Sequence, residues 1–177
     1  MAYATDGKIG IDLTAIYASA SASSMNQLPW TPGTRVTTSE NGTAIFCRAE
    51  STVPAGDCVI FSSYGDSAGT GPVPRAVPIT TTNAAALGWG MVGFAQTAIT
   101  SAYYGWVHLN GNNVQVNLAA SCQPKVPLYT TGNAGILDDA TVSAGYIVGL
   151  VAHTSGSGGG ATLVRCFANH TVTLGHA

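Results

Sequence analysis

The chain has 177 residues, with six Lys and Arg, eight Asp and Glu, and a formal net charge of −2. Charged residues make up only 8% of it, against roughly 25% in typical globular domains. Burying a charge costs much more than burying a paired hydroxyl or amide, so this composition favours a surface that lies against neighbouring proteins. A weakly charged extracellular domain is the alternative. The cations are spread singly, which argues against nucleic acid or a membrane surface as partner.

The sequence gives no sign of export. Its apolar runs break well before the ~20 residues of a membrane span. Its first residues, 1–8, lack the basic start and apolar block of a signal peptide. We therefore expect assembly in the cytosol, where thiols stay reduced. The four cysteines show no CxxC pair or zinc spacing. They are predicted to be buried free thiols, with a Cys47–Cys58 bridge as the alternative.

Residues 1–33 are predicted to form an extended N-terminal arm. Ile9, Ile11 and Leu13 alternate as in a strand, although the same segment also fits a helical stripe. Trp30 lies between two prolines in a stiff turn. It either docks on a neighbouring subunit or folds back onto its own core.

Residues 34–177 are predicted to form a single, mainly β domain. Short apolar runs recur between Gly, Pro and Asn, which is typical of an antiparallel β-sandwich or barrel. The stretch 62–78 is rich in Gly and Pro and is predicted to be a contact loop, with Pro72 and Pro74 in it. Strands are expected near 36–38, 43–47, 57–61, 126–130, 146–153 and 161–168. The last two are predicted to form a hairpin across the Gly-rich stretch 154–160.

The clearest hairpin signal lies at 103–118, where two apolar runs flank Asn-Gly-Asn-Asn at 110–113. On this pairing Trp106 and His108 share a polar face with Gln115 and Asn117. A Trp on the polar side of a hairpin predicts a contact surface.

Motifs that carry chemistry are missing from the sequence: it contains no GxSxG elbow, HExxH helix or P-loop. Asp138 and Asp139 are the only acidic pair. On a strand they would point to opposite faces, whereas on a turn they could bind a cation or cap a helix. We therefore expect no enzyme activity, cofactor or metal. A pocket that gathers His108 with an acidic residue would favour the competing hypothesis of a hydrolase.

Four segments carry a family resemblance: 103–111, 114–122, 126–139 and 147–152. Phrases such as Tyr-Tyr-Gly-Trp-Val-His-Leu-Asn-Gly and Val-Pro-Leu-Tyr-Thr-Thr-Gly-Asn resemble decoration, or cement, proteins of tailed-phage heads. The resemblance covers roughly residues 86–168. It implies a β-rich protein, often trimeric, bound outside the capsid at junctions between major capsid proteins.

The function predicted from these features is that of a capsid decoration protein on the virion surface. Its expected partners are the major capsid protein and other copies of itself, most simply as a homotrimer. Two further hypotheses stay open: a receptor- or glycan-binding module of a fibre or tail, and a neck or tail structural protein. The residues expected at the interface are Ile9, Ile11, Leu13, Trp30, Pro72, Pro74, Tyr104, Trp106 and His108.

Overall fold

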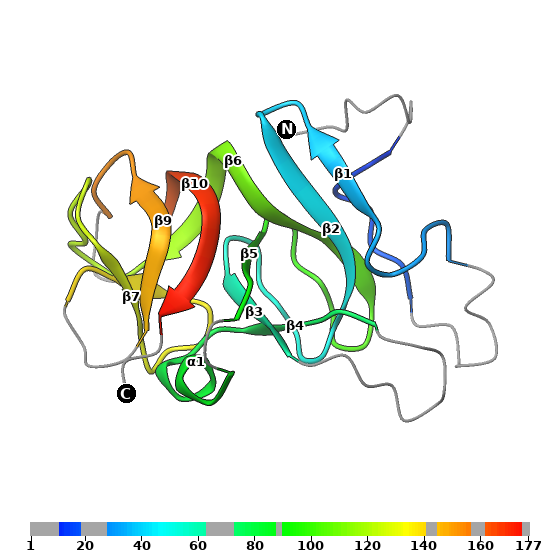
Figure 1. The fold of residues 1–177 in the computed structure, drawn as a ribbon, viewed down its shortest axis with the longest axis horizontal. Coiled ribbons are helices and arrows are strands. Elements are labelled where there is room, and N and C mark those ends of the chain that lie inside the picture. Colours follow the sequence, from blue (N-terminus) through cyan, green and yellow to red (C-terminus); the bar gives the residue numbers. More distant parts are fainter. Residues whose placement is uncertain are drawn as a thin grey trace.

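The computed structural model describes residues 11–18, 28–62, 73–87, 90–140, 145–156 and 162–174, the last five of them through the backbone alone. In Figure 1 the regular structure of the chain consists of strands and one short helix, which confirms the predicted mainly β fold. The elements are β1 (Arg35–Thr38), β2 (Gly42–Ala49), β3 (Cys58–Ser62), β4 (Arg75–Pro78), α1 (Thr81–Leu87), β5 (Val92–Ala95), β6 (Tyr104–Leu118), β7 (Leu128–Thr130), β8 (Leu137–Asp138), β9 (Tyr146–Ala152) and β10 (Thr162–Leu174).

The first half of the chain closes into a barrel, which we call the first barrel. Strand β2 pairs with β4, β4 with β3, β3 with β5, β5 with β6, and β6 again with β2. Strand β1 pairs with the outer side of β2 and stays outside this circuit. Strand β4 lies in the stretch 62–78 that was predicted to be a loop, so that prediction is wrong for its last four residues.

A second barrel uses the other half of the same strand β6. That half pairs with β10, β10 with β9, β9 with β7, and β7 with β8. Strand β8 returns to β6 through one pair, Leu118 with Leu137. The contacts β2–β4 and β6–β8 are parallel, so the sheet is mixed and not purely antiparallel as predicted.

The hairpin predicted at 103–118 is instead one long strand. Residues up to Asn110 pair with β2, whereas Gly111 and the residues after it pair with β10. Gly111 has a φ of 150°, and β6 bends near its middle in Figure 1. The Asn-Gly signal thus marks a change of partner and not a reversal of the chain.

Each barrel has a buried core of its own. Alternation along β3 sends Val59 and Phe61 into the first core, and Cys58 and Ile60 into the second. The first core draws side chains from β2 to β6, and includes Ile45, Val107 and Leu109. The second gathers residues of β6 to β10, including Val116, Leu137, Ile147 and Val164, and also side chains from β3, α1 and β5.

The described parts of the N-terminal segment pack on the outer face of β2 and β6. Ile11 and Leu13 are buried there with Phe46 and Trp106. Residue Tyr17 forms a two-bond bridge with Tyr104, at N···O distances of 2.9 and 2.8 Å. Residues 11–18 form neither a helix nor a regular strand, so neither the strand nor the helix predicted from the apolar pattern is present there.

The short helix α1 begins with a reciprocal cap. The backbone N–H of Thr80 donates to Oδ1 of Asn83 at 2.7 Å, and the N–H of Asn83 donates to the Thr80 hydroxyl at 3.2 Å. The described part of the chain holds no helix with the length and apolar character needed to cross a bilayer.

All four cysteines are buried free thiols, as predicted, and the alternative Cys47–Cys58 bridge does not form. The two residues belong to different cores, because Cys47 packs in the first and Cys58 in the second.

Candidate interaction face and polar pocket

The outer face of β10 and its two neighbours forms the most distinctive surface of the described chain. Outward-pointing residues of β10 lie opposite outward-pointing residues of β6 and β9, because paired residues share one side of a sheet. We call this surface the outer β10 face. Its members are Gln115, Asn117, Val151, Leu163, Arg165 and Phe167.

Large apolar side chains gather on this face. Among the described residues four large hydrophobic side chains are exposed, and Val151 at 41%, Leu163 at 46% and Phe167 at 40% all belong to it. Phe167 lies directly opposite Val151 in the β9–β10 register. Grouped exposed apolar residues mark interaction surfaces, whereas scattered ones need no explanation.

The Asn117 amide on this face is held in place. The Asn117 side chain donates to the Ala55 carbonyl at 3.1 Å and to Oδ1 of Asp57 at 2.9 Å. Burial is the largest influence on Asp57 and raises the pKa of its carboxyl group, while the Asn117 bond acts in the opposite direction. Rigid partners give the face a fixed shape, which lowers the entropy lost when a partner binds.

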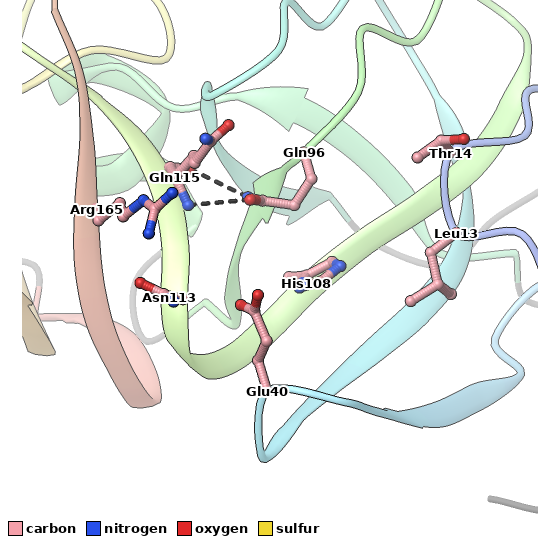
Figure 2. A pocket seen from close by; sticks show the side chains of 8 residues that line it. All are labelled: Leu13, Thr14, Glu40, Gln96, His108, Asn113, Gln115 and Arg165. Atoms are coloured by element: carbon pink, nitrogen blue, oxygen red, sulfur yellow. Dashed lines mark hydrogen bonds between the residues drawn. The ribbon is translucent and has the colours of Figure 1, made fainter. Parts of the chain in front are cut away.

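A polar pocket of about 440 Å³ adjoins the outer β10 face. Figure 2 shows it between the N-terminal segment on one side and β10 on the other, with Glu40 pointing in from below His108. The side chain of Gln96 forms two hydrogen bonds with the backbone of Gln115, at 2.9 and 3.1 Å. The pocket is lined by Leu13, Thr14, Glu40, Gln96, His108, Asn113, Gln115 and Arg165.

The ionisable groups of the pocket are unevenly buried. His108 is only 3% exposed, and burial lowers the pKa of its imidazole from 6.5 to about 4. The ring is therefore neutral at pH 7 and can accept one hydrogen bond and donate another. Glu40 and Arg165 add one carboxylate and one guanidinium to the pocket lining. Within the described ranges none of these three side chains pairs with another residue through an ion pair.

The pocket is better suited to binding than to catalysis. It does gather His108 with an acidic residue, the arrangement that would favour a hydrolase. No Ser or Cys and no second carboxylate is among its described lining residues, however. The one hydroxyl, on Thr14, donates to Oδ1 of Asp12 at 2.6 Å and is not paired with His108. A histidine with a pKa near 4 is also a weak base at neutral pH.

A second polar cluster lies at the end of the second barrel. The ligand atoms of Cys122, Asp138 and Asp139 all lie within 4.8 Å of one another. The two carboxylates thus do share a site, because Asp138 ends strand β8 and Asp139 follows it in a bend. This is the turn arrangement that the sequence left open for cation binding.

The residues predicted at the interface are mostly turned inward. Tyr104, Trp106 and His108 are buried, so the exposed face expected on their strand is wrong. Trp30 folds back onto its own core, with its ring centroid 6.1 Å from that of Trp106. Pro74 is buried as well. The covering residues come from the N-terminal segment, where Ile11 and Leu13 are also buried, while Ile9 and Pro72 lie outside the described residues.

Sequence reasoning missed Val151, Leu163, Arg165 and Phe167. Along β10 the outward residues Leu163 and Phe167 alternate with inward Val164, Cys166 and Ala168. Since both sets are largely apolar, periodicity alone cannot tell the buried side from the exposed one. Arg165 is the only charged residue of β10, and its charge was the one indication of which side of the strand faces outward.

Comparison with known proteins gives limited information. No protein-family model matches the chain, and no curated protein matches it. Among solved structures it is similar to "The crystal structure of head fiber gp8.5 N base in bacteriophage phi29", with a TM-score of 0.49 and 16% identity, over 73% of this chain and 95% of that chain. A likeness at this level assigns no residue roles, so the function has to follow from the surfaces of this chain.

Proposed function

We propose that this chain is a non-catalytic decoration protein that binds the outer surface of a phage head through its outer β10 face. One observation carries the proposal: three of the four exposed large hydrophobic residues in the described chain lie on that face. Arg165 and the amides of Gln115 and Asn117 surround them. Aromatic and Arg side chains within a polar rim are typical of protein interfaces.

The scarcity of charge supports the same role. In the described chain the one ion pair is Arg75 with Glu50, at 3.9 Å. Among the six members of the outer β10 face Arg165 is the only ionisable residue, and His153 lies beside Leu163 and Arg165 at its border. Covering such a face removes few ions from water, so most of the apolar contact remains as net stabilisation.

Stabilisation of a shell then follows from mass action. A protein that binds the assembled lattice and not its separated subunits shifts the equilibrium toward the lattice by the free energy of binding. A homotrimer would present three copies of the outer β10 face, and three linked contacts bind far more tightly than one. Analytical ultracentrifugation of the purified chain tests the trimer: a sedimenting monomer at micromolar concentration contradicts it.

The binding proposal is tested with purified heads of the encoding phage from which the protein has been removed. Wild-type chain, Phe167→Asp and the matched control Tyr103→Asp are each co-sedimented with these heads. Tyr103 is exposed at 37% but lies off the outer β10 face, so its variant adds the same charge elsewhere. We expect wild-type and the control to bind, and Phe167→Asp to lose at least ten-fold in affinity.

The proposal fails if wild-type chain does not bind heads, or if Phe167→Asp binds as well as the control. Electron microscopy of the intact particle separates the head from the alternative locations. Density at the neck or tail would favour the competing hypothesis of a neck or tail protein.

A second candidate function is the binding of a glycan or similar polar ligand in the pocket beside His108. The pocket offers three side-chain amides, from Gln96, Asn113 and Gln115, together with one carboxylate and one guanidinium. Such groups suit sugar hydroxyls, although no aromatic residue is among its described lining residues to stack on a sugar. A glycan array with wild-type and Glu40→Gln tests it: binding that Glu40→Gln abolishes supports the pocket, and no binding by wild-type removes this candidate.

A further inference from the structure

Three metal-binding side chains converge at the end of the second barrel. Cys122 lies in the turn after β6, Asp138 ends β8, and Asp139 follows it. The Sγ atom and the two carboxylates lie within 4.8 Å of one another. Atoms bound to one ion at 2.0–2.3 Å are about 3.5 Å apart when tetrahedral, so these donors need only small movements to share an ion.

Backbone hydrogen bonds hold the two segments together around the cluster. The N–H of Ala119 donates to the carbonyl of Leu137 at 2.8 Å. The N–H of Gln123 donates to Oδ2 of Asp139 at 2.8 Å, and the N–H of Asp139 donates to Oδ1 of Asp138 at 2.8 Å. Each carboxylate is thus oriented through one oxygen and has a second oxygen to offer, which is how supporting contacts fix metal ligands.

The cluster has negative charge without a matching cation. Within the described ranges neither Asp138 nor Asp139 forms an ion pair with Lys, Arg or His. The Cys122 side chain is fully buried, and as a donor its thiol makes a long contact of 3.9 Å to the Gln123 carbonyl. A bound cation would relieve the repulsion between the two carboxylates.

We propose that Cys122, Asp138 and Asp139 form a structural site for a divalent cation of the zinc class. Zn²⁺ takes both sulfur and carboxylate ligands, whereas Ca²⁺ and Mg²⁺ prefer oxygen alone. On binding, the S–H bond of Cys122 breaks, its proton passes to water, and the sulfur electron pair forms the S–Zn bond. Water occupies the fourth position.

The position of the site gives it a role in the fold. Strand β8 has two residues and closes the second barrel on β6 through the single pair Leu118 with Leu137. A metal that joins Cys122 to the end of β8 would reinforce this short closure. Bound metal would thus stabilise the closed second barrel, as structural metals commonly stabilise small folds.

The test uses the full chain freed of metal with a chelator and then titrated with Zn²⁺, or with Co²⁺ as a spectroscopic substitute. With metal at a hundred-fold excess over its Kd, we expect Tm to rise by roughly 5–10 °C. Co²⁺ should give the near-ultraviolet charge-transfer absorption of a thiolate ligand. Cys122→Ser and Asp138→Asn should each lose the Tm shift, and the cobalt band should vanish in Cys122→Ser.

Two matched controls keep the test specific. Cys47→Ala removes a thiol of the first core, and Asp12→Asn removes an exposed carboxylate, so both should keep the Tm shift and the cobalt band. If Cys122→Ser does not fold, Asp138→Asn and the wild-type cobalt spectrum still decide. The proposal is overturned if wild-type chain shows neither shift nor band, if the shift persists in both site variants, or if Ca²⁺ gives an equal shift and Co²⁺ gives no thiolate band.

Discussion

Trp30 and Trp106 meet edge to face, with ring centroids 6.1 Å apart and ring planes 60° apart. Trp106 also contacts Phe46, at a centroid distance of 5.2 Å. This aromatic group joins the N-terminal segment to the outer side of the first barrel. Trp30, which the sequence offers as an exposed contact residue, therefore packs within its own chain and joins these two parts of the fold.

Loss of the contact between Trp30 and Trp106 should destabilise the protein. Trp106 is 1% exposed, so Trp106→Ala should lower the free energy of unfolding by about 3–5 kcal/mol. Trp30 is half-buried, so Trp30→Ala should lower it by about 1–2 kcal/mol. Urea denaturation measures both. Equal effects for the two variants would contradict the different burial of the two rings.

The outer β10 face should tolerate polar substitutions. Leu163 and Phe167 are 46% and 40% exposed, so Leu163→Asn and Phe167→Asn should each change the free energy of unfolding by less than about 1 kcal/mol. Thermal denaturation checks this, with Val164→Asn as the buried neighbour for comparison. A loss from Phe167→Asn as large as that from Val164→Asn would mean that Phe167 supports the fold and is not free for a partner.

Acid should weaken the fold through His108. Its pKa is 6.5 when unfolded and about 4 when folded, so the unfolded chain takes up the proton first as pH falls. The contribution is fully present above pH 6.5 and is lost progressively toward pH 4, by up to roughly 3 kcal/mol. Glu40 and Arg165 are the other ionisable groups that line the same pocket.

The variant His108→Gln isolates this effect, because it removes the titrating ring and leaves Glu40 and Arg165 in place. The difference in unfolding free energy between wild-type and variant should change across pH 4–6.5 and stay flat from pH 7 to 8. A difference that stays constant over the whole range would show that His108 does not titrate as its burial implies.

Substitution of Gly135 by alanine should destabilise the protein, whereas the same substitution at the nearby Gly132 should not. Gly135 has a φ of 76°, and a Cβ there would collide with the carboxyl group of Asp57. Its N–H donates to the Ile79 carbonyl at 2.8 Å, so the backbone cannot move away freely. Gly135→Ala should cost roughly 2–3 kcal/mol of stability. Gly132→Ala is the control, since a Cβ at Gly132 meets nothing within 4 Å, and equal losses for both would refute the argument.

The thiols should be inert in the native protein. Burial raises the pKa of all four, that of Cys122 to about 11 and that of Cys166 to about 12, so very little reactive thiolate exists at neutral pH. A thiol reagent such as Ellman's should titrate four groups in denaturant and none within minutes in buffer. Rapid labelling of one group in buffer would identify a site that opens locally.

The sequence predicts the elements whose signals are local. The pairing of β9 with β10 follows from two apolar runs around the Gly-rich stretch 154–160, and it is confirmed with Phe167 opposite Val151. The buried state of the thiols follows from their apolar neighbours in the chain. In the first case one short Gly-rich connection joins the two runs, and in the second the deciding residues are neighbours in the chain.

The features that sequence reasoning missed depend on distant parts of the chain. The course of β6 depends on β2 and β10, which lie on either side of it in sequence and compete with the local Asn-Gly turn signal. The burial of Trp106 depends on a cover from residues 11–18 and 28–30. The cluster around Cys122 depends on where β8 ends relative to a turn 16 residues earlier, a relation that no spacing rule contains.

The double use of β6 also sets an order of events on the ribosome. The described strands of the first barrel are complete once Asn110 has emerged, but Val114, Val116 and Leu118 belong to a core that needs β10, the last described strand to be made. Until β10 has been made, the apolar side chains and the backbone hydrogen-bonding groups of the second half of β6 remain exposed. The exposed half of β6 can pair with the same strand in other nascent copies. Slower translation after β6 should therefore increase aggregation and not reduce it.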